Sequence, residues 1–320
     1  MDRVTEDRNI SNAVLFVNLH KDEAGQAAEE IRRELEKRNV QVTLFSFKDR
    51  VGSCLQDKWD IAFSLGGDGT VLYAARILAS AVPPAQQEAV PSVSSAASTP
   101  ILPLHFGTLG FLAGVERNKW LAVYQKWIDG TARISSRCML DISVEREGCD
   151  VMRHTCLNDA VVTSSGIAKL IQLEVKTEIA PGEYADLGCY RSDGLIIATP
   201  TGSTAYSMAA GGPILDPEME AVIICPICPF TLSNRPMVLP FRQTLRVTVE
   251  KQQRSGVLLT IDGQDTFELR PDDNIVIRHS PYYTRLITVG HTAYYSALRR
   301  KLSWSGPGRG DDTSRGGEHA

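Results

Sequence analysis

The sequence predicts an α/β domain with a parallel sheet, followed by a second domain built almost entirely of β-strands. Up to about residue 138, short apolar runs alternate with amphipathic helical stretches, as in a parallel sheet covered by helices. Beyond that point, short β-type runs separated by turn residues follow one another. With 320 residues, the chain is long enough for both domains. We therefore expect an α/β domain over 1–138 and an all-β domain over 139–290.

The first domain opens with a βαβ pattern. Residues 13–18 (AVLFVN) form an apolar run typical of a buried strand. Apolar residues recur on one face of 22–38, which predicts an amphipathic helix. Residues 40–47 alternate as a second strand does. The three segments together predict two parallel strands joined by a helix.

A third strand ends in a glycine-rich turn at residues 60–79 (DIAFSLGGDGTVLYAARILA). Ile61, Phe63 and Leu65 alternate, and a buried helix pattern begins directly after the glycines. Glycines permit positive φ and a close approach of backbone N–H groups to an anion, which the start of a helix also attracts. The turn is therefore a candidate phosphate site. It contains neither GxxxxGK[ST] nor GxGxxG.

Asp68 is unexpected inside such a turn, because a carboxylate repels a phosphate. It has three possible roles: holding a metal, accepting a proton from an attacking hydroxyl, or capping the helix, where aspartate is favoured. The turn alone does not decide between them.

The rest of the first domain contains an insertion and a second glycine turn. Residues 83–100 are rich in proline, serine and alanine without periodicity, which predicts an exposed flexible loop. A strand over 101–104 leads into the turn HFGTLGFLAG, and 118–128 has a helical pattern.

In the second domain, the segment YRSDGLIIATPTGSTAY combines a strand over 195–199, a tight turn and a further helix start. Hydroxyl groups at the turn and free N–H groups at the helix start predict a second polar site facing the first across a cleft. IDGQ at 261–264 predicts an Asp-Gly hairpin turn. Residues 291–304 predict a final amphipathic helix, and 305–320 a disordered tail.

Composition limits the class of protein. A net charge of −4 argues against nucleic acid as the main partner, and no apolar run approaches the roughly 20 residues of a membrane span. Residues 1–12 resemble neither a signal nor a transit peptide. Seven scattered cysteines indicate a reducing compartment, so we expect a cytoplasmic protein. The CPIC pair, Cys225 and Cys228, lacks a second pair for zinc, which favours a structural role.

Four motifs in one order resemble the NAD kinase family. They are GGDGT at 66–70, GTLGFL at 107–112, LND at 157–159 and DGLIIATPTGSTAYSMAAGGPIL at 193–215. The resemblance covers about residues 14–304, and TPTGSTAY is its most specific part. It implies a Rossmann-like first domain, a β-sandwich-like second domain, and a C-terminal segment that returns to the first domain.

The resemblance also implies an activity, in which the γ-phosphoryl of ATP passes to the 2′-hydroxyl of the adenosine ribose of NAD, giving NADP. Asp68 would be the base that accepts the proton of that hydroxyl. Mg²⁺ or another divalent cation is expected with ATP, and no dedicated protein metal site. We also expect a homo-oligomer, a dimer or tetramer, without nucleic-acid or membrane partners.

The remaining site residues are carried over by motif. Donor phosphates would be bound by Gly66, Gly67, Gly69, Thr70, Thr201 and Ser203. The NAD ribose hydroxyls would meet Asn158 and Asp159. The rest of the dinucleotide would meet Phe111, Arg191, Asp193, Thr204, Ala205 and Tyr206, with Asp193 at the nicotinamide amide and Arg191 at an interface or phosphate.

Alternatives stay open at several positions. Asn158 and Asp159 also suit an ordinary turn, Arg191 and Asp193 a surface ion pair, and 201–204 a helix cap. Asp159 replaces the glutamate usual in the family and keeps its charge; Phe230 stands where relatives often have histidine. A lipid kinase of the diacylglycerol or sphingosine type shares GGDG, and a non-catalytic dinucleotide-binding protein is the rival outside enzymes. The sequence does not choose between ATP and polyphosphate, or between NAD and NADH.

Overall fold

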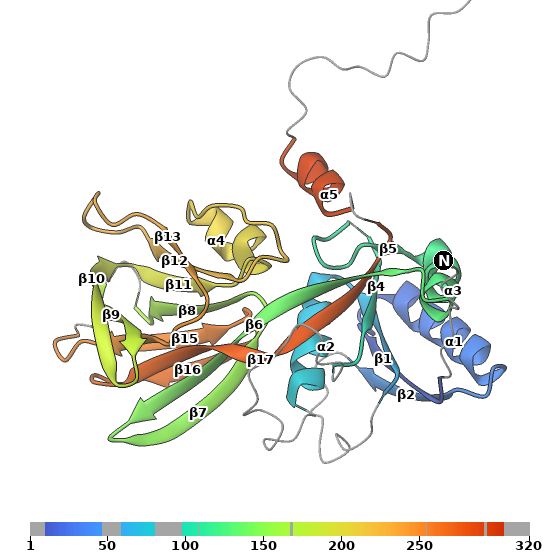
Figure 1. Ribbon diagram of the computed structural model, residues 1–320, viewed down its shortest axis with the longest axis horizontal. Coiled ribbons are helices and arrows are strands. Elements are labelled where there is room, and N and C mark those ends of the chain that lie inside the picture. Colours follow the sequence, from blue (N-terminus) through green and yellow to red (C-terminus); the bar gives the residue numbers. More distant parts are fainter. Residues whose placement is uncertain are drawn as a thin grey trace, which may run out of the picture.

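The computed structural model describes residues 10–46, 59–80, 98–107, 109–166, 169–253, 255–290 and 293–303. A parallel sheet forms the centre of the first domain (Figure 1). Its strands lie in the order β4, β3, β1, β2, all parallel. Their bounds are Asn12–Val17 for β1, Gln41–Ser46 for β2, Ile61–Gly66 for β3 and Ile101–His105 for β4.

Helices cover both faces of this sheet. Helices α1 (Asp22–Glu36) and α3 (Trp120–Ile128) pack on one face, in a core that contains Leu15 and Phe63. Helix α2 (Asp68–Ser80) packs on the other face, against Val14 and Phe16. This arrangement follows from the sequence, because strands covered on both faces are apolar at every position. A short strand β5 (Val115–Glu116) and a 3₁₀ turn η3 (Arg117–Lys119) precede α3.

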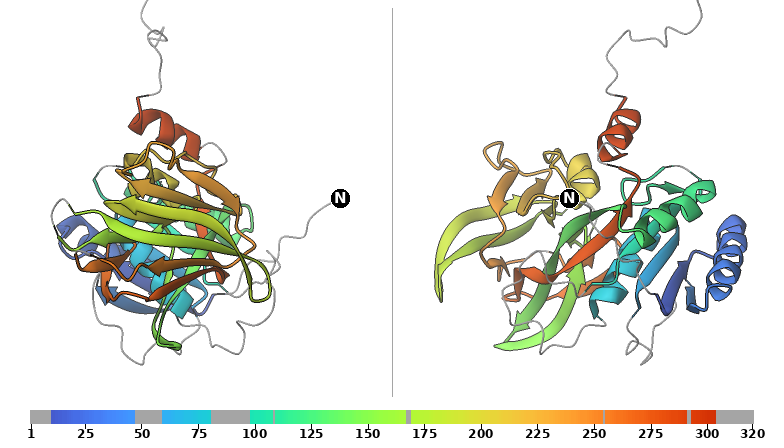
Figure 2. Two further views of the ribbon diagram at one scale, coloured as in Figure 1. Left: turned by 90° about the vertical axis from the view of Figure 1, so that its left-hand side faces the viewer. Right: turned by 45° about the vertical axis from the view of Figure 1, so that its right-hand side comes forward.

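The second domain consists of two sheets that enclose one core (Figure 2). One sheet has six strands in the order β13-β12-β11-β8-β15-β16. They are Asp159–Ser164 (β8), Gly194–Ala198 (β11), Ala221–Ile227 (β12), Met237–Pro240 (β13), Val257–Ile261 (β15) and Asp265–Leu269 (β16). The facing strands are Arg133–Arg146 (β6), Cys149–Cys156 (β7), Ile171–Ala180 (β9), Glu183–Ser192 (β10), Leu245–Val249 (β14) and Asn274–Thr288 (β17).

Two long strands join the domains. Strands β6 and β17 pair antiparallel from Thr288 with Arg133 to Asn274 with Glu145. Strand β17 also pairs with β4, which makes the parallel sheet and one layer of the second domain a single sheet of 11 strands. The domain boundary predicted at residue 138 falls inside β6.

The fold class predicted from the sequence is confirmed, since a helix-covered parallel sheet precedes two packed β-sheets. Helix α5 (Ala293–Lys301) lies within the predicted final helix, and its Tyr294 ring contacts Phe111 of the first domain. Most of the predicted loop at 83–100 and the predicted tail at 305–320 lie outside the described residues.

Candidate functional site

The glycine turn that the sequence predicts as a phosphate site lies directly after β3. Helix α2 begins at Asp68, and a Cβ added to Gly66 would lie 2.2 Å from Thr70 Oγ1 and 3.1 Å from Asn18 Cβ. Close packing therefore requires glycine at 66. The expected positive φ is not found, because Gly66, Gly67 and Gly69 have none. The first N–H groups of α2 have no partner within the helix, so they remain an anion-attracting end.

The Asp68 carboxylate binds another loop and does not cap its own helix. Its Oδ2 accepts from the N–H of Phe111 at 2.9 Å, and its Oδ1 accepts from Leu112 at 3.0 Å and from Ala113 at 2.9 Å. The first bonds of α2 instead reach the carbonyl of Gly67. The capping interpretation is therefore wrong in this structure. Asp68 thus connects the GGDG turn to the GTLGFL turn. Its Oδ2 atom can accept one more hydrogen bond.

Lys21 also reaches this edge of the sheet, although the sequence analysis did not select it. Its Nζ donates to the carbonyl of Phe106, whose N–H in turn donates to the carbonyl of Gly66 at 2.9 Å. Gly107 follows with φ +99°, a conformation suited to glycine. Lys21 forms no ion pair with any residue in the described part of the chain. Its remaining donors are thus available beside the glycine turn.

The LND segment is held by Asp262 of the predicted hairpin turn. The Asp262 carboxylate accepts from the N–H groups of Leu157 at 3.0 Å, Asn158 at 2.7 Å and Asp159 at 3.2 Å. Asp262 and Gly263 both have positive φ, which confirms the Asp-Gly turn between β15 and β16. The sequence analysis assigned Asp262 only to the turn and did not predict its hydrogen bonds to the LND segment.

Asp159 is buried beside Asp262, with 4% of its surface exposed. Burial, and then the Asp262 carboxylate, raise the pKa of Asp159 to about 7. Burial also raises the pKa of Asp262, although its three N–H partners act in the opposite direction. Asp159 therefore does not keep a full negative charge near neutral pH, contrary to the expectation from its side-chain type.

The TPTGST turn lies against the LND segment, but it does not start a long helix. Residues 202–204 form a 3₁₀ turn (η4, Gly202–Thr204), followed by a four-residue helix α4 (Tyr206–Ala209). The turn's N–H groups bond internally, from Ser203 to Pro200 and from Ala205 to Gly202. A helix therefore does start here as predicted, but it ends after one turn, because the chain turns again at residues 209–212.

The side chains of this turn differ in their surroundings. Ser203 is fully buried, and its hydroxyl bonds the Pro200 carbonyl and the Leu215 N–H, so its predicted phosphate contact gains no support from this geometry. The hydroxyl of Thr201 is buried without a described partner. Thr204 bonds the Thr201 carbonyl, whereas Tyr206 is 47% exposed. Gly202 allows the turn to contact Asn158, since a Cβ there would lie 2.1 Å from the Asn158 carbonyl oxygen.

Arg191 and Asp193 lie away from these groups. Asp193 precedes β11, while Ala198 at the other end of β11 pairs with Asp159. At the usual rise per residue, the length of β11 separates them by about 16 Å. The Arg191 guanidinium stacks on Phe230 with 4.9 Å to the ring centroid, and the two residues form no ion pair among the described contacts. The surface ion-pair alternative is therefore wrong here.

The remaining motifs converge on one place between the domains. Leu157 packs in the same core as Val71 of α2 and Leu112 of the GTLGFL turn. Across the gap, Gln264 Nε2 donates to the Gly69 carbonyl at 2.9 Å, and Arg76 of α2 pairs with Asp265. A helix start, a lysine and a carboxylate thus face a polar turn from the second domain. Such a site can hold a phosphate chain beside a hydroxyl and accept a proton.

Comparison with known proteins assigns the chain to a family. The sequence model of the ATP-NAD kinase C-terminal domain matches residues 157–289. An NAD kinase of Treponema denticola is 35% identical over 298 residues, which are 93% of this chain and 98% of that protein. The chain belongs to the NAD kinase family. The NAD kinase of Moorella thermoacetica is 37% identical over 306 residues, 93% of this chain and 91% of its own.

Solved NAD kinase structures show the same fold. Yeast NADH kinase, solved with NADH, matches with a TM-score of 0.76 over 94% of this chain and 90% of its own. The Archaeoglobus fulgidus NAD kinase, solved with ATP, matches with a TM-score of 0.66 over 92% of this chain and 99% of its own. Both are 22% identical in sequence, so they support the NAD kinase fold and carry no residue assignments. None of these comparisons supports a lipid kinase.

Proposed function

We propose that this NAD kinase transfers the γ-phosphoryl of ATP to the 2′-hydroxyl of the adenosine ribose of NAD, with Asp68 as the base. The observation that carries the proposal is the position of the Asp68 carboxylate at the start of α2, held by three N–H groups. This arrangement fixes the carboxylate where the helix start attracts phosphates. Family membership supplies the substrates.

The two oxygens of Asp68 would serve different roles. Oδ1 accepts two N–H bonds and acts as the anchor, whereas Oδ2 accepts one and can take the proton of the ribose hydroxyl. As that proton moves to Oδ2, the ribose oxygen forms a bond to the γ-phosphorus. The bond from the γ-phosphorus to the bridging oxygen breaks, and ADP leaves. Because phosphoryl transfer depends mainly on positioning and charge, a rigid carboxylate is well suited to it.

A divalent cation, in our proposal Mg²⁺, would accompany the phosphates of ATP and neutralise their charge. Among the described residues, no three metal-ligating side chains form a cluster. Mg²⁺ is commonly held by substrate phosphates with one or two carboxylates. Asp68 is a carboxylate within the predicted phosphate-binding turn itself.

On the dinucleotide side, we propose that Asn158 and Asp159 contact the ribose and that Thr204, Ala205 and Tyr206 contact the adenosine. The LND segment and the TPTGST turn support this, because they touch at Gly202. Protonated Asp159 can donate a hydrogen bond to a ribose oxygen, which a carboxylate cannot do.

We propose that the protein forms a homo-oligomer, a dimer or tetramer, with Arg191 and Asp193 at its interface. They lie at the far end of β11 from the other site residues, and Arg191 stacks on Phe230, which is 68% exposed. Leu232, two residues further along the chain, is 83% exposed. An exposed apolar patch of this kind is typical of an interface. We propose that these residues contact the dinucleotide bound to a second copy. Light scattering tests the assembly.

A cytoplasmic location remains part of the proposal. The described cysteines are all free, as expected in a reducing compartment. Of the pair Cys225 and Cys228, Cys225 is buried and Cys228 is exposed. No helix in the described part of the chain is long and apolar enough to cross a membrane.

The deciding experiment incubates the purified protein with NAD or NADH, ATP or polyphosphate, and Mg²⁺, and measures NADP(H). NADP should form only when a phosphoryl donor and a divalent cation are both present. Phosphorylation of diacylglycerol or sphingosine without product from NAD would refute the proposed function.

A further inference from the structure

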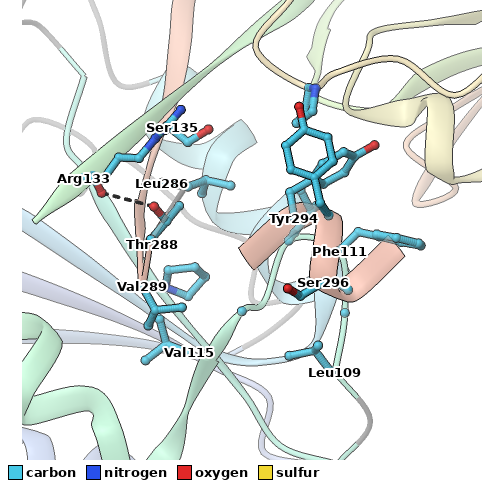
Figure 3. Close-up of a pocket in the computed structure, with 18 of the residues that line it drawn as sticks. Leu109, Phe111, Val115, Arg133, Ser135, Leu286, Thr288, Val289, Tyr294 and Ser296 are labelled. Carbon is cyan, nitrogen blue, oxygen red and sulfur yellow. Dashed lines mark hydrogen bonds between the residues drawn. The ribbon is translucent and has the colours of Figure 1, made fainter. Parts of the chain in front are cut away.

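A cavity of about 440 Å³ is lined in part by Gly110, Phe111 and Leu112 of the GTLGFL turn. Figure 3 shows Phe111, Tyr294 and Ser296 on one side of it and Arg133, Leu286 and Thr288 on the other. Asp68, Asn158 and Thr204 do not line it, whereas Phe111, which the family resemblance also places beside the dinucleotide, does. Its volume is that of a small-molecule site.

Arg137 of β6 lines this cavity and has an unusual environment. Only 5% of the residue is exposed, yet it forms no ion pair with any described residue. Its single described bond runs from Nε to Ser135 Oγ at 2.8 Å. A buried arginine without a charged partner is costly, because arginine is rarely buried unless paired. Burial lowers the pKa of Arg137, and this effect outweighs the opposite effect of the nearby Glu218 and Asp216 carboxylates, neither of which bonds the guanidinium.

The acidic side chains of the cavity are already bound elsewhere. Glu218 accepts two bonds from Arg133 and one from Ser135, and Asp216 accepts a bond from Tyr295 at 2.6 Å. The donors at the end of the Arg137 guanidinium have no acceptor among the described residues. An anion from solution would supply one.

We propose that this cavity is an effector site for a small organic carboxylate, which pairs with Arg137 and places its apolar body against the walls. A guanidinium binds a carboxylate through two parallel hydrogen bonds. A single negative charge is favoured over a phosphate dianion, because Glu218 and Asp216 lie nearby. The apolar body fits because Leu109, Phe111, Leu286 and Val289 form much of the lining.

The effector role follows because the same residues contact both the cavity and the Asp68 carboxylate. Phe111 and Leu112 line the cavity, and their N–H groups hold the Asp68 carboxylate on the other side. A ligand packed against these residues changes the position or mobility of Asp68. This part of the inference rests on the proposed function, whereas binding itself does not.

Calorimetry and ligand-observed NMR with benzoate and hexanoate test the binding without any nucleotide. Benzyl alcohol and inorganic phosphate are the neutral and dianionic comparisons. We expect both carboxylates to bind the wild type, with Kd at least tenfold lower than for either comparison. Arg137→Met should weaken benzoate binding by roughly 10- to 100-fold, as expected for losing one charge-assisted bond. Arg153→Met, at an exposed arginine on β7, should leave it unchanged.

A second variant tests the cavity without touching Arg137. Ser296→Phe places a ring in the cavity from α5 and should block benzoate. In wild type, saturating benzoate should change the NAD phosphorylation rate at least twofold at saturating NAD and ATP, and should not displace NAD.

Several results would overturn the inference. They are no carboxylate binding, equal binding in Arg137→Met, displacement of benzoate by NAD, or an unchanged rate at full occupancy. A wild type that binds benzoate but never phosphorylates NAD refutes the proposed function, and with it the effector role, while the binding site stands.

Discussion

The Asp68 carboxylate lies directly against Gly110, so that a Cβ added to Gly110 would be 1.7 Å from Oδ1. The contact explains why the GTLGFL turn has glycine at this position. Three consecutive N–H groups after Gly110 reach the carboxylate only because the backbone approaches it so closely.

Gly110→Ala should displace Asp68 and weaken the loop contact. We expect the free energy of unfolding to fall by about 1–3 kcal/mol, as for overpacking of a tight site, and NAD phosphorylation to fall with it. Thermal melting and steady-state assays measure both. Gly114→Ala is the matched control, since its added methyl group meets no atom within 4 Å. Equal behaviour of the two variants would contradict the importance of the contact.

Asp68→Asn separates the catalytic role of the carboxylate from its structural one. The amide retains one oxygen for the N–H groups but presents an NH₂ group where a second acceptor is needed, so stability should fall by about 1 kcal/mol. The turnover rate should fall by roughly 10²- to 10⁴-fold, because an amide does not accept the proton. Calorimetry should show NAD affinity within about tenfold of wild type. Near-normal turnover would restrict Asp68 to holding the loop.

The raised pKa of Asp159 predicts that the protein becomes less stable as the pH rises. Its pKa is raised from 3.8 to about 7, so the folded state binds the proton more tightly than the unfolded chain. The stability that this provides is complete below about pH 4 and is lost as the pH rises through 7. Asp159→Asn should not lose this stability as the pH rises. The unfolding free energy of the variant minus that of the wild type should therefore increase by up to about 4 kcal/mol between pH 4 and pH 8.

Urea unfolding of the wild type and Asp159→Asn across this pH range measures the difference. Glu23→Gln on the exposed surface of α1 is the control, for which the difference should stay constant. A constant difference for Asp159→Asn as well would show that the proton is not held there.

Lys21→Met tests whether its ammonium serves the phosphate donor. If Lys21 contacts the phosphates, the KM for ATP should rise by about 10- to 100-fold, the effect of losing a charge-assisted hydrogen bond. The KM for NAD should change little, and Lys21→Arg should restore much of the effect. Lys37→Met, at a lysine whose side chain is 72% exposed, is the control. Parallel increases for NAD and ATP, with a lower melting temperature, would indicate a structural role.

The sequence predicted those parts of the site that local pattern encodes. The strand, glycine turn and helix at 61–80 follow from alternation and helical period, and their position at the end of a parallel strand follows from the βαβ order. The Asp-Gly turn at 262–263 was readable in the same way. The family resemblance added the expected role of Asp68 as the base.

Contacts between distant segments could not be predicted. The N–H groups held by Asp68 and by Asp262 belong to other loops, and backbone donors leave no mark in the sequence. The second helix starts where it was predicted, but the glycines and proline after Ala209 end it after one turn. The raised pKa of Asp159 depends on burial, which a two-residue motif does not report.

The long pairing of β6 with β17 has a mechanical consequence. Each strand continues from one domain into the other, with one register shift in their pairing between His279 and Tyr283. The two halves therefore lack the flexible connection about which hinged enzymes open and close. Heating should therefore melt them together, as one cooperative transition in scanning calorimetry. Substrates would enter by movement of the loops around a stiff frame, and neither half is expected to remain folded when expressed alone.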